Sequence, residues 1–78
     1  MSRTDIEDKI RSILAKVARL EGAYSAQADL FRELGVKSIA ALDLLLTLEE
    51  EFGVAIADEA FGKARSVDEL VSLVGELR

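Results

Sequence analysis

The chain has 78 residues, half of them apolar, and 10 basic against 15 acidic residues give a formal net charge of −5. This length suits one domain over residues 1–78 with one small core, and the apolar share argues against a disordered chain. There is no His and no Cys, which excludes disulfides, the usual transition-metal ligands and Ser-His or Cys-His nucleophile pairs. We therefore expect no metal site and no catalytic residue, and predict that the protein is not an enzyme.

The charges are unevenly distributed along the chain. From Ser38 through Gly62 there is no Lys or Arg, and all the charged residues are acidic. One stretch of the surface should therefore be negative. Such a surface repels nucleic acid and anionic lipid and attracts proteins with basic patches. The polar N-terminus and the absence of a long apolar run predict a cytoplasmic protein without a membrane segment. A monomer is expected.

The first predicted helix covers residues 5–21. Thr4 and Glu7 have the spacing of a capping box, apolar residues then recur at helical spacing, and Gly22 is expected to end the helix. Residues 23–37 form a long connection, of a length that is usually functional in a compact domain. Its predicted anchors on the core are Leu30, Phe31 and Leu34.

The second predicted helix covers residues 38–52, with Gly53 as its stop. A helical wheel divides it into two faces. The predicted core face holds Ala41, Leu42, Leu44, Leu45, Leu48 and Phe52. The other face holds Asp43, Thr47 and Glu50, with Ile39 and Leu46 beside them. Large apolar residues among acids on an outer face are typical of a surface that binds partners.

Two further helices are predicted before the end of the chain. Residues 58–62 form a short helix with Asp58 as its cap and Phe61 turned inward. Residues 67–77 form the last helix, and Ser66 with Glu69 is a candidate capping box. The predicted fold class is all-α, a small bundle of three main helices and one short helix with a long loop between the first and second.

Ser38 lies where the second helix begins. Serine is a preferred N-cap, so capping alone could account for it. However, Ala41 stands where a capping box has Glu or Gln, and Lys37 places positive charge at the positive end of the helix dipole. A phosphodiester on such a serine would lie among unpaired backbone N–H groups. Ser38 is therefore a candidate modification site.

The segment from Leu34 to Ile39, followed by a helix that ends in Leu48-Glu49-Glu50-Glu51-Phe52, resembles the acyl carrier protein family. The resemblance implies that Ser38 carries 4′-phosphopantetheine, attached covalently from coenzyme A. It also implies that acidic and apolar positions of the second helix contact partner enzymes. Thr47 is added because the helical wheel places it on the same outer face. The predicted partner-binding residues are Ile39, Asp43, Leu46, Thr47, Glu49 and Glu50.

By this resemblance, the function is to carry acyl intermediates as thioesters for fatty-acid, polyketide or other secondary lipid biosynthesis. The implied partners are a phosphopantetheinyl transferase and acyl-loading and acyl-transferring enzymes with basic docking patches. A peptidyl or aminoacyl carrier and an unmodified helical adaptor are the alternatives. Lys37 replaces the family's usual Asp, Ala40 stands where an acid is frequent, and the proline common before the short helix is missing. These departures suggest a specialised, discrete carrier of the bacterial type.

Overall fold

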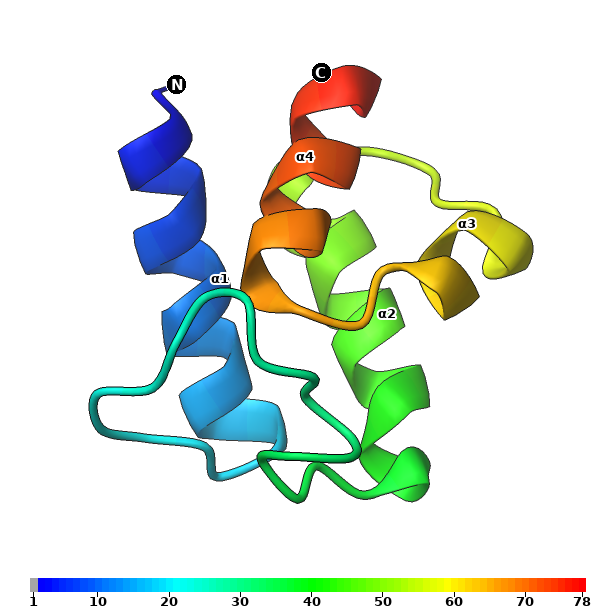
Figure 1. Cartoon of the computed structure of the whole chain (residues 1–78). Helices are drawn as coiled ribbons and strands as arrows, with labels where there is room; N and C mark the ends of the chain where they lie inside the picture. The colour runs from blue at the N-terminus through cyan, green and yellow to red at the C-terminus, as the bar shows by residue number, and fades with distance from the viewer. Residues whose placement is uncertain (1) are drawn as a thin grey trace.

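The computed structural model describes residues 2–78, and within them the secondary structure is entirely helical (Figure 1). The helices are α1 (Arg3–Val17), α2 (Ser38–Phe52), α3 (Asp58–Lys63) and α4 (Val67–Leu77). The predicted class is therefore confirmed: three main helices, one short helix and a long loop between α1 and α2. None of the helices in residues 2–78 is long and apolar enough to cross a membrane.

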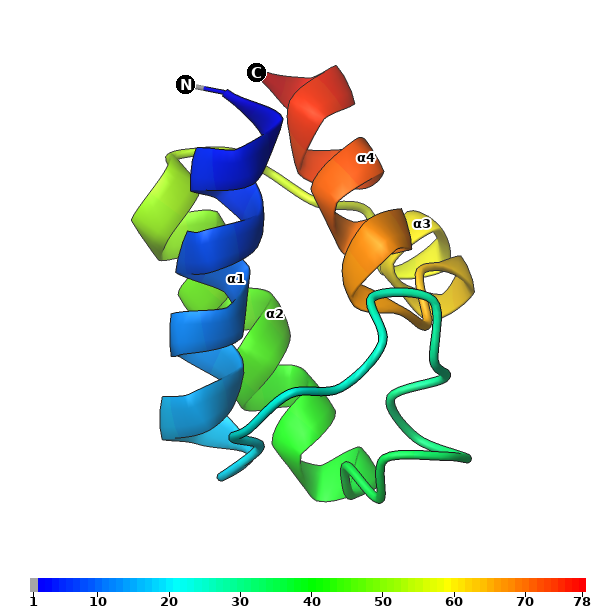
Figure 2. The ribbon, with the colours of Figure 1, turned by 60° about the vertical axis from the view of Figure 1, so that its left-hand side comes forward.

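The helices enclose one continuous core. α1 packs against both α2 and α4, and α3 packs against α4. Figure 2 shows the loop of residues 18–37 running from the end of α1, past the start of α4, to the start of α2. Both chain ends lie at the pole opposite the start of α2 (Figures 1 and 2). The largest fully buried side chains are those of Ile10, Leu14, Leu30, Leu44, Leu48, Val67, Leu70, Val71 and Val74.

α2 has the predicted bounds but not the whole predicted core face. Leu44, Leu45, Leu48 and Phe52 are buried, and Gly53 ends the helix in the left-handed conformation with φ of 64°. Leu42 was expected in the core and is 62% exposed instead, and Ala41 is only half-buried. The buried stripe of α2 is therefore narrower than its apolar stripe.

α1 differs from the prediction at both ends. Its N-cap is Ser2, whose hydroxyl accepts from Asp5 N–H (3.1 Å) while the Asp5 carboxylate accepts from Ser2 N–H (3.4 Å). This capping box starts the helix two residues before the predicted Thr4–Glu7 pair. At the other end the helix stops at Val17, because Arg19 adopts a left-handed conformation with φ of 54°. The predicted stop at Gly22 is therefore wrong.

The caps of the last two helices are partly as predicted. Ser66 caps α4 by accepting from Glu69 N–H (3.2 Å), which confirms its role. The Glu69 carboxylate accepts from Arg65 N–H (3.0 Å). α3 ends at Lys63, and its N-cap is Ala57, with no side-chain capping bond. Asp58 is thus the first helical residue and not the predicted cap, although its negative charge at a helix start is favourable.

Candidate functional site

Ser38 is the first residue of α2, and its side chain is exposed. The N-cap position is held by Lys37, and no side chain makes a capping hydrogen bond at this end. The interpretation of Ser38 as only a helix cap is therefore wrong. Its hydroxyl has no hydrogen-bond partner within residues 2–78 and is open to an approaching enzyme.

The start of α2 is suited to a negatively charged group. The first N–H groups of a helix have no carbonyl in a preceding turn, and the helix dipole places partial positive charge there. No acidic residue occupies the first turn of α2. The positive end of this helix thus lacks its usual side-chain anion, directly beside the Ser38 hydroxyl.

The loop before α2 is fixed to the core, which sets the position of Ser38. Val36 is buried, and its N–H donates to the Leu30 carbonyl (2.9 Å). Leu30 is buried as predicted, and its N–H donates in turn to the Arg65 carbonyl (2.7 Å). Gly35 has φ of 75°, a conformation that a residue with a side chain rarely adopts. These contacts hold a sharp turn just before the serine.

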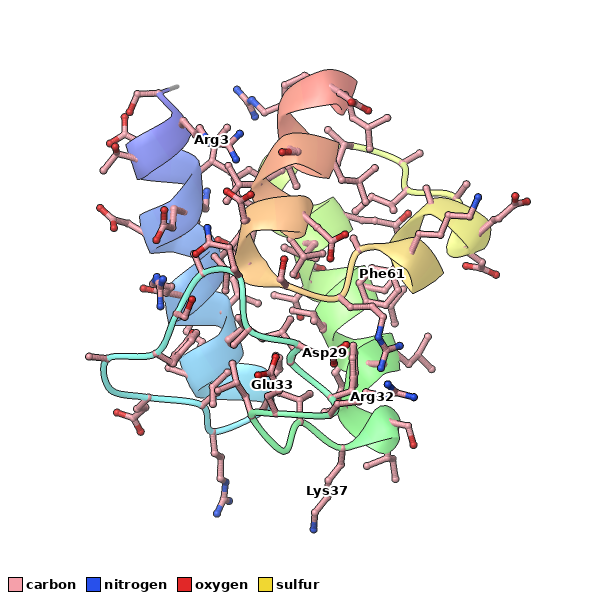
Figure 3. All side chains as sticks on the ribbon, in the orientation of Figure 1. Arg3, Asp29, Arg32, Glu33, Lys37 and Phe61 are labelled. Atoms are coloured by element: carbon pink, nitrogen blue, oxygen red, sulfur yellow. The ribbon has the colours of Figure 1, made fainter. Side chains whose placement is uncertain are left out.

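Asp29 ties the same loop to the connection between α3 and α4. Its carboxylate accepts from Arg65 Nε (2.8 Å), from Phe31 N–H (2.9 Å) and from Arg32 N–H (2.8 Å). The Arg65 guanidinium also lies over the Phe31 ring, 4.9 Å from its centroid. The Arg65 hydrogen bond and the backbone N–H bonds lower the pKa of Asp29 from 3.8 to about 2. Figure 3 shows Asp29 on the loop near Glu33, whose carboxylate accepts from Asp29 N–H (2.7 Å).

A pH dependence of stability follows from Asp29. Because its folded-state pKa is lowered, its contribution is complete above its ordinary pKa of 3.8 and is lost as the pH falls toward about 2. We expect the urea midpoint of the wild type to decrease across this window, and that of Asp29→Asn to be lower at neutral pH and to decrease less. Asp8→Asn, at an exposed position of α1, is the control and should retain the full decrease. Parallel curves for the wild type and Asp29→Asn would contradict this role.

A pocket of about 350 Å³ adjoins Ser38. Its lining residues come from the loop before α2, from α2, from α3 and from the connection after α3: Phe31, Ser38, Ala41, Phe61, Gly62 and Arg65. Phe61 is half-buried and packs against the core, as its predicted inward orientation requires. Figure 3 shows its ring on the side of α3 that faces α2. The serine thus lies at the edge of a largely apolar depression.

Large apolar side chains are exposed along α2. Ile39 is 83% exposed and Leu46 is 53% exposed, and Asp43 and Glu50 are exposed near them. The helical wheel placed Leu42 on the core face, but its side chain is exposed and extends the apolar surface formed by Ile39 and Leu46. Only its low burial reveals it, because its spacing in the sequence equally fits the core.

Two of the predicted partner-binding residues are less accessible. Thr47 and Glu49 are half-buried. The Glu49 carboxylate accepts from Ile56 N–H (2.8 Å), so this residue holds the connection after α2 in place. The three consecutive glutamates therefore have different surroundings. The Glu50 side chain is exposed, the Glu49 carboxylate is hydrogen-bonded within the protein, and Glu51 Oε1 lies 3.7 Å from Lys9 Nζ.

Comparison with known proteins agrees with this geometry. A family model described as "Phosphopantetheine attachment site" matches residues 8–74. The chain belongs to the acyl carrier protein family. Acyl carrier protein 2 of Ralstonia nicotianae is 36% identical over 78 residues, with 99% of this chain and 96% of that protein covered. The mitochondrial acyl carrier protein of Dictyostelium discoideum is 32% identical over 72 residues, covering 92% of this chain, and the chain spans 60% of that relative's length.

A solved structure shares the fold. The acyl carrier protein of Thermotoga maritima superimposes with a TM-score of 0.82 at 29% identity, covering 99% of this chain and 91% of that one. As an acyl carrier protein, the chain is a non-catalytic carrier with a 4′-phosphopantetheine prosthetic group. Membership also implies interaction with a phosphopantetheinyl transferase and with enzymes that handle acyl groups.

Proposed function

We propose that Ser38 is the attachment site. Its hydroxyl oxygen would lose its proton and bond to the phosphorus of the 4′-phosphopantetheine part of coenzyme A, while the pyrophosphate P–O bond breaks and adenosine 3′,5′-bisphosphate leaves. The observation that carries this proposal is an exposed serine hydroxyl without an internal hydrogen bond at the first residue of α2. The unpaired N–H groups and the uncompensated positive dipole end suit a phosphodiester at that place. When bound, the group supplies a terminal thiol that carries acyl groups as thioesters.

The chain's own residues contribute position and recognition. The fixed turn at Gly35 and the anchored loop hold Ser38 at the surface, so the attached arm starts from a defined point. We propose that partners read α2 through Ile39, Asp43, Leu46, Thr47 and Glu50, with Leu42 added by its exposure. Glu49 was predicted to belong to this surface, but its bond to Ile56 N–H favours a supporting role. Tethering raises the effective concentration of the acyl group at each partner's active site.

We further propose that this carrier acts as a monomer in the cytoplasm, in fatty-acid, polyketide or secondary lipid biosynthesis. The acidic character of α2 supports partners with basic docking patches, since no Lys or Arg lies between Ser38 and Gly62. The departures at Lys37 and Ala40 support a specialised carrier.

The attachment site is tested by intact mass. Wild-type protein incubated with coenzyme A, magnesium and a phosphopantetheinyl transferase should gain one phosphopantetheine mass, and Ser38→Ala should gain none. Ser12→Ala removes another exposed serine and should load like the wild type. Equal loading of Ser38→Ala and the wild type would place the arm on another residue.

A further inference from the structure

A second pocket, of about 370 Å³, lies between the end of α1 and the start of α2. Its apolar walls are formed by Val17, Ala18, Ile39 and Ala40, and two cations, Arg19 and Lys37, border it. We call it the cationic pocket. Lys37 and Ile39 are the chain neighbours of Ser38, so this pocket adjoins the attachment site. Of its lining residues, only Ile39 belongs to the partner-binding surface proposed above.

Arg19 is an unusual residue for its backbone conformation. It follows the C-cap of α1 with φ of 54° and is the only residue other than glycine with positive φ among residues 2–78. Glycine is the residue that this position favours, because a side chain makes the left-handed conformation costly. A cation near a helix C-terminus recovers part of that cost. Even so, we expect glycine at position 19 to stabilise the folded protein more than arginine does.

Lys37 is likewise unfavourable for local stability. It holds the N-cap of α2, where Asp, Asn, Ser or Thr would accept a hydrogen bond from the first turn. Lysine has no acceptor atom, and its charge meets the positive end of the helix dipole. Figure 3 shows its side chain extending away from the body of the protein.

The two cations also lack partners, in contrast to others in the molecule. Arg3, Arg11 and Arg65 each form an ion pair at 2.7–2.9 Å, whereas Arg19 and Lys37, like Lys16 and Arg32, form no ion pair or side-chain hydrogen bond within residues 2–78. Two residues that each oppose local stability therefore border the same apolar pocket. Departures from local preference are expected at functional sites, where they are compensated elsewhere.

We propose that the cationic pocket is a docking site for a partner enzyme that presents an apolar side chain flanked by carboxylates. The apolar walls suit the side chain, and the two free cations suit the carboxylates. Asp43 and Glu50 lie farther along α2. The partner's surface should therefore carry acidic residues where it contacts the region next to Ser38, and basic residues where it contacts the rest of α2. This inference rests on the proposed attachment at Ser38, since the partner that reaches the serine is the one that docks here.

The experiment uses the full chain and a phosphopantetheinyl transferase that modifies it. Arg19→Gly and Lys37→Asn each remove one cation without adding an anion, and each improves local geometry, because glycine suits the left-handed position and Asn can cap α2. Neither should therefore lower the melting temperature. We expect the double variant to raise KM about tenfold or more at low salt, with kcat within about twofold, because rim charges act mainly on encounter. Arg3→Asp is the control: it lowers the net charge by two units, as the double variant does, but at the opposite pole (Figure 3), and it should leave KM near the wild-type value.

A charge exchange identifies the partner groups. Lys37→Glu should be rescued when one carboxylate at the rim of the transferase active site is replaced by lysine. An unchanged or lower KM in the double variant, or no rescue at any rim carboxylate, would overturn the docking site. The intact mass at completion is read separately. Full loading of the docking variants together with no loading of Ser38→Ala keeps Ser38 as the attachment site whichever way KM moves, and loading of Ser38→Ala counts against Ser38 itself.

Discussion

Replacing Leu48 by Ala is expected to destabilise the protein by about 2–5 kcal/mol, the range for truncating a fully buried leucine. Leu48 has no exposed surface, and it lies in the C-terminal half of α2 as part of the continuous core. Small domains have only about 5–15 kcal/mol of stability, so this single change should remove a large fraction of it. Urea unfolding followed by circular dichroism measures the effect.

Leu42→Ala is the matched control for Leu48→Ala. It makes the same truncation in the same helix at a side chain that is 62% exposed, and surface changes of this kind stay within about 0.5 kcal/mol. The two variants therefore separate burial from helix propensity. A loss at Leu42 equal to that at Leu48 would mean that Leu42 is covered in solution.

Glu50→Lys is expected to slow docking of a partner with a basic patch by about tenfold at low salt. Glu50 is exposed on α2, and charges at the rim of an interface act mainly on the association rate. The effect should shrink as salt is added, because the Debye length falls to about 8 Å at physiological ionic strength. The measurement is the initial rate of phosphopantetheine transfer at subsaturating carrier, at two salt concentrations.

Glu76→Lys changes the net charge by the same amount as Glu50→Lys. Glu76 is exposed on α4, outside the proposed surface, so this variant should react at nearly the wild-type rate at both salt concentrations. If both variants slow the reaction equally, total charge governs encounter and α2 has no special part in it.

The helix ends show which parts of the fold can be predicted from local sequence. The limits of α2 and α4 were correct because Gly53 and Ser66 act through their own backbone and neighbouring residues. α1 was misplaced because Ser2 with Asp5 and Thr4 with Glu7 are both capping pairs by spacing, and nothing local decides between them. Its C-terminal end was missed because an arginine adopts a conformation that sequence rules assign to glycine.

The site was predictable as far as it depends on one helix. The serine position and the exposure of Ile39 and Leu46 followed from the periodicity of α2. Leu42 did not, because its burial depends on which neighbouring elements cover it. The ion pair between Asp29 and Arg65 joins residues 36 apart in the chain, and the bond from Ile56 N–H to Glu49 crosses the end of a helix. Such contacts appear only once the chain is folded.

The placement of the two chain ends has a practical consequence. Both lie at the pole away from the start of α2 (Figures 1 and 2), and near that pole Arg78 donates to the Phe52 carbonyl (3.1 Å). A fluorophore, an affinity handle or a sensor surface joined at residue 2 or residue 78 would leave the whole start of α2 facing free solution. Immobilised in that orientation, the molecule would present Ser38 uniformly, so binding kinetics could be recorded without a population blocked by its own attachment.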